Sequence, residues 1–569
     1  MAGACAGRFG IQAALADGIA AGERAIAALG LAPKPLSVPA VAGEESWQGS
    51  WLGLVPGASP RRAFVDFQND VTAKDIVAAA AEGFAAVEHL KRYTTTGMAT
   101  DQGKTSNLNA LGLLEEARGG SAREGVRGYT TFRPPFTPVS FGVLAGLARG
   151  PHLDPIRRTP LHDALAARGA KFEEVGQWLR PRYLPKPGED MARAVLRECR
   201  AVRERVGLFD ASTLGKIEVA GPDAALFLDR FYATPLARLA PGKARYVLLL
   251  GENGFVLDDG IAARLEAGRY HVTTSTGGAA RVLALMEDYR QTEWPELEVW
   301  LASVTDEWAV LALQGPMARS VLAPLVRGID LDRATFPHMA VREGEILGVP
   351  LRLFRASFTG ELGFELNVPA DQAAHLFEVL AERVEAAGGA IYGTETMHVL
   401  RAEKGYIVIG QETDGTVSPF DLGLDFAVGM KKPDFVGKRS LGLPALRRPD
   451  RPQLVGLLPN EPGFVPAPGA QLLAEPSPRP GTPALGYVTS AYWSATLGRG
   501  FALALLAGGR GRLGEEVFIQ RLDGPAMRAR VTAPVFYDPE GTASMSELAP
   551  APATAPPRPR GQGGARPCP

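Results

Sequence analysis

The stretch from Tyr246 to Leu265, YVLLLGENGFVLDDGIAARL, most constrains the fold of this chain. Two apolar runs flank the tetrapeptide Gly251-Glu252-Asn253-Gly254. Apolar spacing with a period of two on both sides of a glycine-rich turn is typical of a β-hairpin. The sequence therefore predicts two antiparallel strands joined at residues 251–254.

An adjacent acid pair, Asp258-Asp259, follows at the start of the second strand. Because side chains alternate along a strand, the two carboxylates should point to opposite faces of the sheet, one to solvent and the other to a cavity. A carboxylate in a cavity can accept a proton or hold an amine, which makes the pair a candidate catalytic site. The pair is equally compatible with a solvated turn held by an Asx-type hydrogen bond.

Composition narrows the class of protein. A length of 569 residues predicts several domains, and a net charge of −1 gives no electrostatic case for binding nucleic acid or an anionic membrane. The three cysteines, Cys5, Cys199 and Cys568, are too scattered for a disulfide framework, which favours a reducing, cytoplasmic setting. The seven histidines show no metal-binding spacing, so we expect no metal site. No run approaches the roughly 20 apolar residues of a membrane span.

Local patterns predict the remaining elements. We expect an alanine-rich helix over residues 1–30, a strand over 62–67, and one helix that starts with a capping box at 72–75 and continues to residue 90. Asp190 and Asp371 should each cap a helix. Short strands and Pro/Gly turns over 453–537 favour a small β-barrel, whereas residues 546–569 cannot bury enough apolar surface to fold.

Several motifs together resemble one family. They are RVGLFDASTLGKIEVAGPDAALFLDRF (residues 205–231), the acid pair, FTGELGFELNVPA (358–370) and GTETMHVLRAEKGYIVIGQETDGTVSPFDLGLDFAV (393–428). In this order and spacing they resemble the glycine-cleavage T-protein (aminomethyltransferase) family, over about residues 205–538.

An upstream segment resembles a narrower group. Its motifs are AFVDFQNDVTAKDI (63–76), HLKRYTTTGMATDQGKTSNLNALGLL (89–114), TTFRPPFTPVSFGVLAG (130–146) and GAKFEEVGQWLRPRYLP (169–185). They are similar to the alpha subunits of heterotetrameric sarcosine oxidases, and plain T-proteins do not carry this segment.

The resemblance implies an α+β, multidomain chain with a T-protein-like domain of antiparallel sheets and packed helices. We expect the end of a dinucleotide-binding domain and a linker over 1–45, a middle domain that contacts flavin or a partner over 46–160, a folate-binding domain over 161–445, a β-barrel over 446–540 and a disordered tail over 541–569. No GxGxxG motif follows a strand. We therefore expect that the family's NAD site is missing and that the chain is truncated at its N-terminus.

The resemblance also implies the site residues. Asp259 matches the acid beside the folate nitrogens, and Glu365 matches the glutamate that anchors the pterin. Tyr246, Asp258, Arg401 and Tyr406 should complete the folate site. Local alternatives stay open: Glu365 as a surface residue, Tyr246 as a core aromatic, and Arg401 in a surface pair with Glu403 or Glu395. Met397 stands where many T-proteins have an arginine, so one charged contact to the folate tail or substrate is absent.

The upstream segment offers a flexible polar patch that we expect to contact a flavin or the partner chain, or else to be a solvated loop. It comprises Lys91, Arg92, Thr94, Gln102, Lys104 and Thr105. Its QGKT string lacks the first glycine of a P-loop.

The resemblance implies a subunit of a sarcosine oxidase complex with beta, gamma and delta partners. A partner would hold the flavin and oxidise sarcosine, and this chain would transfer the resulting one-carbon unit to tetrahydrofolate, giving 5,10-methylenetetrahydrofolate and glycine. The alternatives are a stand-alone aminomethyltransferase and a non-catalytic folate-binding module. The sequence leaves open which N-methyl amine is oxidised, because that choice belongs to the flavin-bearing chain.

Overall fold

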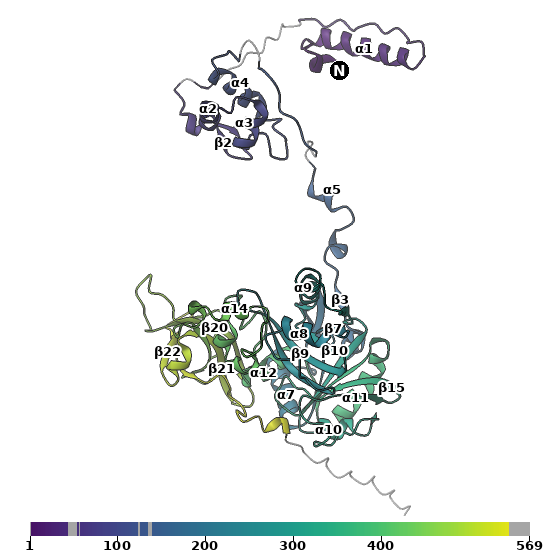
Figure 1. Cartoon of the computed structure of the whole chain (residues 1–569), viewed down its shortest axis with the longest axis vertical. Coiled ribbons are helices and arrows are strands. Elements are labelled where there is room, and N and C mark those ends of the chain that lie inside the picture. Colours follow the sequence, from purple (N-terminus) through teal and green to yellow (C-terminus); the bar gives the residue numbers. More distant parts are fainter. Residues whose placement is uncertain (1, 44–53, 56, 123–125, 135–138, 546–569) are drawn as a thin grey trace, which may run out of the picture. The chain divides into compact units, whose positions relative to one another are not determined.

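The computed structural model describes residues 2–43, 54–55, 57–122, 126–134 and 139–545 (Figure 1). It divides into two compact units, residues 1–153 and 154–569. Of the disordered tail predicted over 541–569, residues 541–545 are described and include a 3₁₀ turn (Ala543–Met545), whereas residues 546–569 lie outside the described residues.

The first unit contains helix α1 (Ile11–Ala28) and a small α/β body. In that body, β1 (Phe64–Asp66) pairs antiparallel with β2 (Val71–Thr72), and α2 (Ala73–Ala81), α3 (Val87–Thr94) and α4 (Asn107–Ala117) bury a shared apolar core. The predicted capping box of Thr72 and Asp75 opens α2. The single helix to residue 90 is wrong, because Gly83 adopts a left-handed φ of 96° and separates α2 from α3.

The second unit begins with two sheets. The first has the order β11-β7-β10-β9-β8. Its strands are β7 (Gly215–Ala220), β8 (Lys243–Leu250), β9 (Val256–Glu266), β10 (Arg269–Thr274) and β11 (Trp300–Ser303). The predicted hairpin is confirmed as β8 and β9, and Gly254 has the positive φ of 81° that its turn requires. Helices α8 (Ala224–Phe231) and α9 (Ala279–Thr292) contribute to the apolar core of this sheet.

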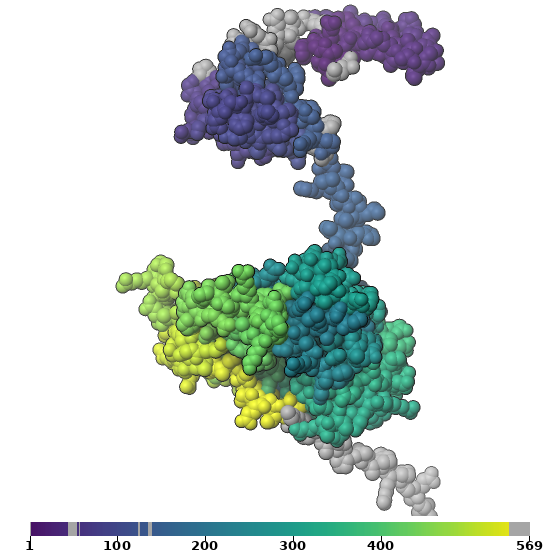
Figure 2. Space-filling model, viewed as in Figure 1, coloured from purple at the N-terminus to yellow at the C-terminus, as the bar shows by residue number. Residues whose placement is uncertain are grey.

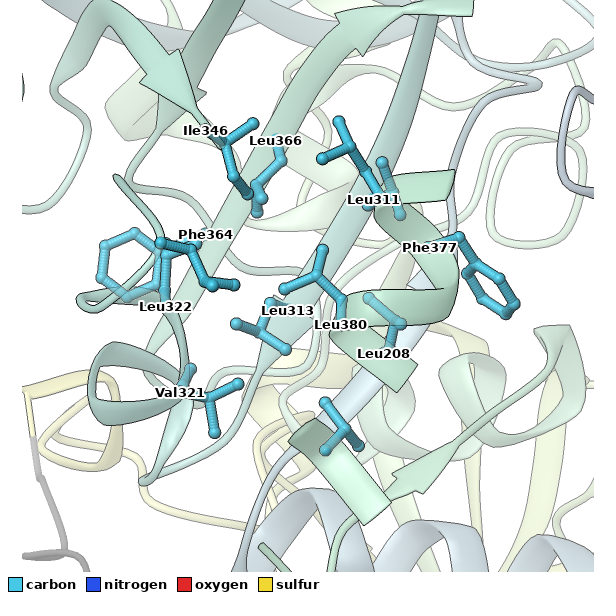
Figure 3. Close-up of a cluster of buried hydrophobic side chains, with 14 of the residues drawn as sticks. Leu208, Leu311, Leu313, Val321, Leu322, Ile346, Phe364, Leu366, Phe377 and Leu380 are labelled. Atoms are coloured by element: carbon cyan, nitrogen blue, oxygen red, sulfur yellow. The ribbon is translucent and has the colours of Figure 1, made fainter. Parts of the chain in front are cut away.

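The second sheet has the order β13-β14-β15-β16-β12-β6-β17 and is antiparallel except for the β17–β6 pair. Its strands are β6 (Gly207–Asp210), β12 (Trp308–Gln314), β13 (Val326–Arg327), β14 (Val341–Ile346), β15 (Val349–Phe354), β16 (Gly363–Pro369) and β17 (Ala390–Ile391). Helices α10 (Ala318–Leu322) and α11 (Ala373–Ala386) cover one face, where Leu313, Phe364 and Leu380 meet in the core (Figure 3). Asp371 does not cap α11, because it lies in a 3₁₀ turn and Gln372 is the residue before the helix.

Strand β12 divides its side chains between two environments. Ala309, Leu311 and Leu313 belong to the helix-covered core, whereas Ala312 and Gln314 face a cavity on the other side of the sheet. Ala312 pairs with Glu365 on β16 and with Phe209 on β6. The register therefore places these three residues in one row across the cavity face.

A smaller sheet and two long helices complete the central part of the unit. Strands β3 (Arg157–Arg158), β5 (Trp178–Tyr183) and β4 (Lys171–Val175) form the sheet, and α6 (His162–Ala167) connects β3 to β4. Asp190 caps α7 (Met191–Glu204) as predicted, accepting a hydrogen bond of 2.9 Å from the backbone N–H of Arg193. Helix α12 (Thr394–Glu403) packs on α7 and β5. Cys199 is a buried free thiol on α7, as its apolar surroundings predict.

The predicted barrel is confirmed as a closed barrel of β18 (Pro452–Pro459), β21 (Arg499–Ala507), β20 (Gly486–Ser494), β19 (Gln471–Leu473), β22 (Glu516–Ile519) and β23 (Met527–Thr532). In Figure 2 its yellow-green surface packs directly against the rest of the second unit, and the barrel strands share a core cluster with the β8–β9 hairpin. Within the described residues, no helix combines the length and the apolar character that a bilayer crossing needs.

Candidate active site

One cavity of about 1770 Å³ opens in the second unit. Its lining residues include some from the two large sheets, from helix α12 and from the barrel. Of the six predicted folate-site residues, Asp259, Tyr246, Glu365 and Tyr406 line this cavity, although they come from separate parts of the chain. Asp258 and Arg401 do not line it.

Asp259 and Tyr246 form a hydrogen-bonded pair across the hairpin. The Tyr246 hydroxyl donates to Asp259 Oδ2 at 2.7 Å. Burial raises the pKa of Asp259 to about 7, and the neighbouring Asp258 adds to this, while the bond from Tyr246 opposes it. A carboxyl group with a pKa near 7 can both accept and donate a proton at physiological pH, which suits general acid–base catalysis.

Asp258 points away from the cavity, as the strand alternation predicts, but it does not reach solvent. Its side chain is buried, because the segment after β10 covers it. Oδ1 accepts hydrogen bonds from the backbone N–H of Asp259 at 2.9 Å and of Ser275 at 3.3 Å, and burial raises the pKa of Asp258. Asp258 therefore fastens the end of β10 to β9, and the expectation that one acid faces solvent is wrong.

Glu365 lies on the cavity face of β16. Burial raises its pKa to about 7. The alternative of a surface glutamate is wrong, since the side chain lines the cavity and is only partly exposed. Within the described residues its carboxylate has no hydrogen-bond partner, so both oxygens can accept hydrogen bonds from a ligand with a paired N–H edge.

Aromatic rings form the walls between these polar groups. Phe209 and Tyr392 stack with ring centroids 5.2 Å apart, and the Tyr392 hydroxyl donates to Gln314 Oε1 at 3.1 Å. Phe358 and Tyr406 stack at 6.0 Å and an interplanar angle of 23°. Such flat apolar walls with a few polar groups are typical of sites for ring-containing ligands.

Arg401 lies behind the cavity wall rather than in it. Both Arg401 and Glu412 are fully buried, with Nη1 2.7 Å from Glu412 Oε2. Arg401 also donates to the Tyr406 carbonyl at 2.8 Å and to the Ser490 hydroxyl of β20 at 2.8 Å. The predicted surface pair with Glu403 or Glu395 is wrong, and the predicted role in the wall is indirect, because Arg401 holds the loop that carries Tyr406.

Sequence reasoning missed several residues of the cavity: Arg180, Phe209, Gln314, Tyr392 and His398. Met397, which stands where many T-proteins have an arginine, also lines the cavity and is buried. Arg180, Phe209, Gln314 and His398 stand in ordinary strand or helix patterns, and Tyr392 lies in the short connection between β17 and α12. Only the three-dimensional convergence of β5, β6, β12 and α12 brings them together.

The predicted flavin or partner patch lies in the first unit. Lys91 and Gln102 are buried. Lys91 donates a hydrogen bond to the backbone carbonyl of Thr131 at 2.6 Å, and Gln102 accepts one from the backbone N–H of Arg133 at 2.9 Å. Thr105 donates to Asp101 Oδ2 at 2.6 Å, and Thr94 donates to the Leu90 carbonyl at 2.8 Å. Bonds within the unit therefore hold most of the patch.

Arg92 is exposed and forms an ion pair of 3.4 Å with Glu88. Lys104 is an exposed side chain of the same patch. Contact of this patch with a flavin or a partner chain stays a prediction.

Comparison with known families agrees with this architecture. The GCVT N-terminal domain model matches residues 161–432, and the glycine cleavage T-protein C-terminal barrel domain matches residues 453–538. The sarcosine oxidase A3 domain matches residues 60–147. The site residues Tyr246, Asp259 and Glu365 all fall within the first match.

Two relatives cover almost all of the chain. Sarcosine oxidase subunit alpha of Corynebacterium sp. (strain P-1) is 45% identical over 95% of this chain and 57% of its own length. The protein of the same name from Rhizobium meliloti (strain 1021) is 46% identical over 95% of this chain and 55% of its own length. The chain thus spans slightly more than half the length of these relatives.

Shorter relatives match nearly in full. An aminomethyltransferase of Symbiobacterium thermophilum is 33% identical, with 67% of this chain and 97% of that protein covered. The crystal structure of glycine cleavage system aminomethyltransferase T from Bartonella henselae superposes with a TM-score of 0.58 at 27% identity, covering 67% of this chain and 98% of that one. The chain therefore belongs to the glycine-cleavage T-protein (aminomethyltransferase) family, in a form that also carries a sarcosine oxidase A3 domain and is similar to sarcosine oxidase subunit alpha.

Proposed function

We propose that this chain is the one-carbon-transfer component of a sarcosine oxidase. It receives the iminium formed when sarcosine loses two electrons and two protons, and it passes the methylene carbon of this iminium to tetrahydrofolate, giving 5,10-methylenetetrahydrofolate and glycine. The observation that carries this proposal is the convergence of Asp259, Tyr246 and Glu365 on one cavity with aromatic walls. The similarity to sarcosine oxidase subunit alpha supports sarcosine as the amine that is oxidised, and the T-protein fold supports tetrahydrofolate as the acceptor of the carbon.

Glu365 anchors the acceptor. Its carboxylate accepts two parallel hydrogen bonds from the amidine-like edge of the pterin, an interaction that is about twice as strong as one between neutral groups. The proton that burial leaves on Glu365 near pH 7 is lost on binding, since the pterin N–H groups favour the charged form. The stacked pair of Phe358 and Tyr406 covers part of the same wall.

Asp259 moves the protons. A folate nitrogen attacks the iminium carbon and forms a C–N bond, and the second folate nitrogen then displaces the amine of glycine. The iminium nitrogen has one proton, and the two folate nitrogens lose one each, so the released glycine carries three and no net proton is consumed. Asp259 accepts a proton from a folate nitrogen and returns it to the leaving amine, and Tyr246 holds the carboxylate in position. Enclosure protects the iminium from water, which would otherwise release formaldehyde.

We further propose that the flavin lies on a partner among the beta, gamma and delta subunits. When bound there, the flavin supplies the two-electron oxidation of the amine. Among the patch residues of the first unit, Arg92 and Lys104 are the candidates to face that partner, because both carry an exposed positive charge, whereas Lys91 and Gln102 are buried. The free thiols of Cys5 and Cys199 favour a cytoplasmic setting.

A decisive experiment compares the wild-type complex with Asp259→Asn. The tagged chain is recovered from its native cell with its partners and given sarcosine and tetrahydrofolate. We expect the variant to oxidise sarcosine at the wild-type rate, to form 5,10-methylenetetrahydrofolate about 10²–10⁴-fold more slowly, and to release formaldehyde instead.

Equal rates of methylenetetrahydrofolate formation in both proteins would remove Asp259 from the mechanism. Recovery of a colourless chain without a flavoprotein would remove the oxidase assignment. A chain of that kind that still transfers the carbon would be a stand-alone aminomethyltransferase, the second candidate, which the nearly complete match to aminomethyltransferases favours.

A further inference from the structure

Arg180 on β5 is a buried cation that lines the cavity and takes no part in the proposed reaction. Its residue is 8% exposed, and its Nε has no hydrogen-bond partner. The guanidinium carbon lies 5.7 Å from the ring centroid of Phe209, and no hydrogen bond or ion pair to a described residue accompanies this contact. A buried charge without an anionic partner is costly, so this position favours an anionic ligand.

Two carboxylates near Arg180 are already engaged. Asp210 accepts hydrogen bonds from the Thr159 hydroxyl at 2.6 Å and from the backbone N–H of Ser212 at 3.0 Å. Glu173 lies 3.5 Å from the Arg182 guanidinium and accepts a hydrogen bond from Thr394. Burial lowers the pKa of Arg180, and the attraction of these two acids opposes that shift without cancelling it.

A second group without a partner lines the same cavity. His398 on α12 has a buried Nδ1 with no hydrogen-bond partner among the described residues. Burial lowers its pKa to about 3, and the positive charges of Arg401 and Arg180 act in the same direction. The imidazole is therefore neutral and offers one hydrogen bond to a ligand without adding charge.

We propose that Arg180, assisted by His398, forms a carboxylate-binding subsite in the cavity. This inference rests on the proposed function and names a further part of the same site. The planar guanidinium can bind both oxygens of a carboxylate, and its carbon lies 5.7 Å from the centre of the Phe209 ring. The carboxylate can come from the glutamyl tail of the folate or from the amino acid.

The strand register favours the folate tail. Glu365, Ala312 and Phe209 stand in one row on three adjacent strands, so Glu365 and Phe209 are two strand spacings, about 10 Å, apart. Arg180 lies over the far end of this row. A single ligand with a pterin on Glu365 and a carboxylate on Arg180 would span the row.

The test uses the full chain and four ligands. They are 5-formyltetrahydrofolate, the same compound with an uncharged amide in place of its glutamate (5-formyltetrahydropteroyl amide), the tail fragment 4-aminobenzoylglutamate, and glycine. Dissociation constants are measured by calorimetry for wild type, Arg180→Gln, the conservative Arg180→Lys and Glu365→Gln, after thermal unfolding has shown which variants fold.

We expect Arg180→Gln to weaken 5-formyltetrahydrofolate and 4-aminobenzoylglutamate at least about 10-fold, to leave the glutamate-free compound unchanged, and Arg180→Lys to recover part of the loss. Glu365→Gln should weaken both pterins and spare the tail fragment. Loss of glycine binding alone in Arg180→Gln would assign the carboxylate to the amino acid.

Two outcomes overturn the subsite. One is unchanged binding of every carboxylate ligand in a folded Arg180→Gln, and the other is equal weakening of the compounds with and without glutamate. Failure of wild type to bind either pterin would instead refute the proposed function. In that case, comparing the binding of the tail fragment to wild type and to Arg180→Gln would still test whether Arg180 binds a carboxylate.

Discussion

At the scale of single residues, the cavity holds two carboxyl groups whose charged forms are poorly solvated. Burial is the first cause of the raised pKa of both Asp259 and Glu365, which stands at about 7 in each case. Groups with a pKa perturbed by burial are frequent at functional sites, because catalytic acids and bases need pKa values that suit the proton transfers they carry out. The folded protein therefore carries a cost in stability for the charges that its proposed chemistry uses.

Glu365→Gln tests the anchor. The amide keeps the shape of the side chain but has one acceptor oxygen instead of two, so binding of 5-formyltetrahydrofolate should weaken about 10- to 100-fold, as expected for loss of a charge-assisted pair. Calorimetry measures this, with Glu345→Gln on the exposed side of β14 as the matched control. Similar binding in both variants would contradict the anchor role.

The same two carboxyls predict how stability depends on pH. Their pKa values are about 7 in the folded state, against ordinary values of 3.8 for aspartate and 4.5 for glutamate, so the folded state binds more protons than the unfolded state between these limits. Their contribution is fully favourable below about pH 4 and is lost as pH rises through 7. Asp259→Asn with Glu365→Gln should therefore raise the free energy of unfolding by about 1 to 3 kcal/mol at pH 8 and by much less at pH 5.

Denaturant unfolding of wild type and the double variant at both pH values measures this difference. An equal gain at pH 5 and pH 8 would show that the two carboxyls are not desolvated in the folded state.

The sequence identified single residues well where a motif carried them. Asp259, Tyr246, Glu365 and Tyr406 were expected in one site, and all four line the cavity. The sequence could not show that Asp258 would be covered by the end of β10 or that Arg401 would be buried against Glu412, because both depend on segments distant in the chain. Arg180 escaped notice for the same reason.

At the scale of elements, one buried ion pair fastens three parts of the second unit together. Arg401 on α12 meets Glu412, and Glu412 in turn accepts hydrogen bonds from the Thr489 hydroxyl of β20 at 2.9 Å and from the backbone N–H of Val408 at 2.9 Å. The pair therefore joins helix α12, the loop of residues 406–412 and the barrel. The loop carries Tyr406, whose ring stacks on Phe358 at the cavity wall.

Arg401→Gln should lower the free energy of unfolding by about 3 to 5 kcal/mol, because Glu412 would be left buried and unpaired. Arg448→Gln is the matched control, since Arg448 pairs with Asp450 on the surface, where both side chains are more than 60% exposed. That control should change stability by less than about 1 kcal/mol. Denaturant unfolding compares the two, and equal losses would mean that the Arg401 pair contributes nothing beyond a surface pair.

Elements with local signals were predicted correctly, including the hairpin, the cap at Asp190 and the barrel. The helix from residue 73 to 90 was not, because the apolar spacing continues through Gly83 while the backbone does not. Asp371 has the residue type of a cap, but the chain turns through a 3₁₀ segment before α11 begins. Periodicity describes which face is apolar and does not reveal such interruptions.

At the scale of the whole molecule, the chain consists of two compact units, and the complete cavity belongs to residues 154–569. We expect a protein of residues 154–569 to fold alone and to bind 5-formyltetrahydrofolate with a dissociation constant within about twofold of the full chain, because every described residue that lines the cavity lies in the second unit. Calorimetry on both proteins measures this, and residues 1–153 alone should bind no folate. A loss of more than tenfold would show that the first unit takes part in the site.

The two faces of strand β12 differ in how they can change during evolution. Odd-numbered positions such as Leu311 and Leu313 serve the core, and even-numbered ones such as Ala312 and Gln314 serve the cavity. Point substitutions at even positions can alter ligand preference over generations while the core stays intact. A one-codon insertion or deletion in this strand exchanges the two sets at once, so lineages can explore new ligands here only through substitutions.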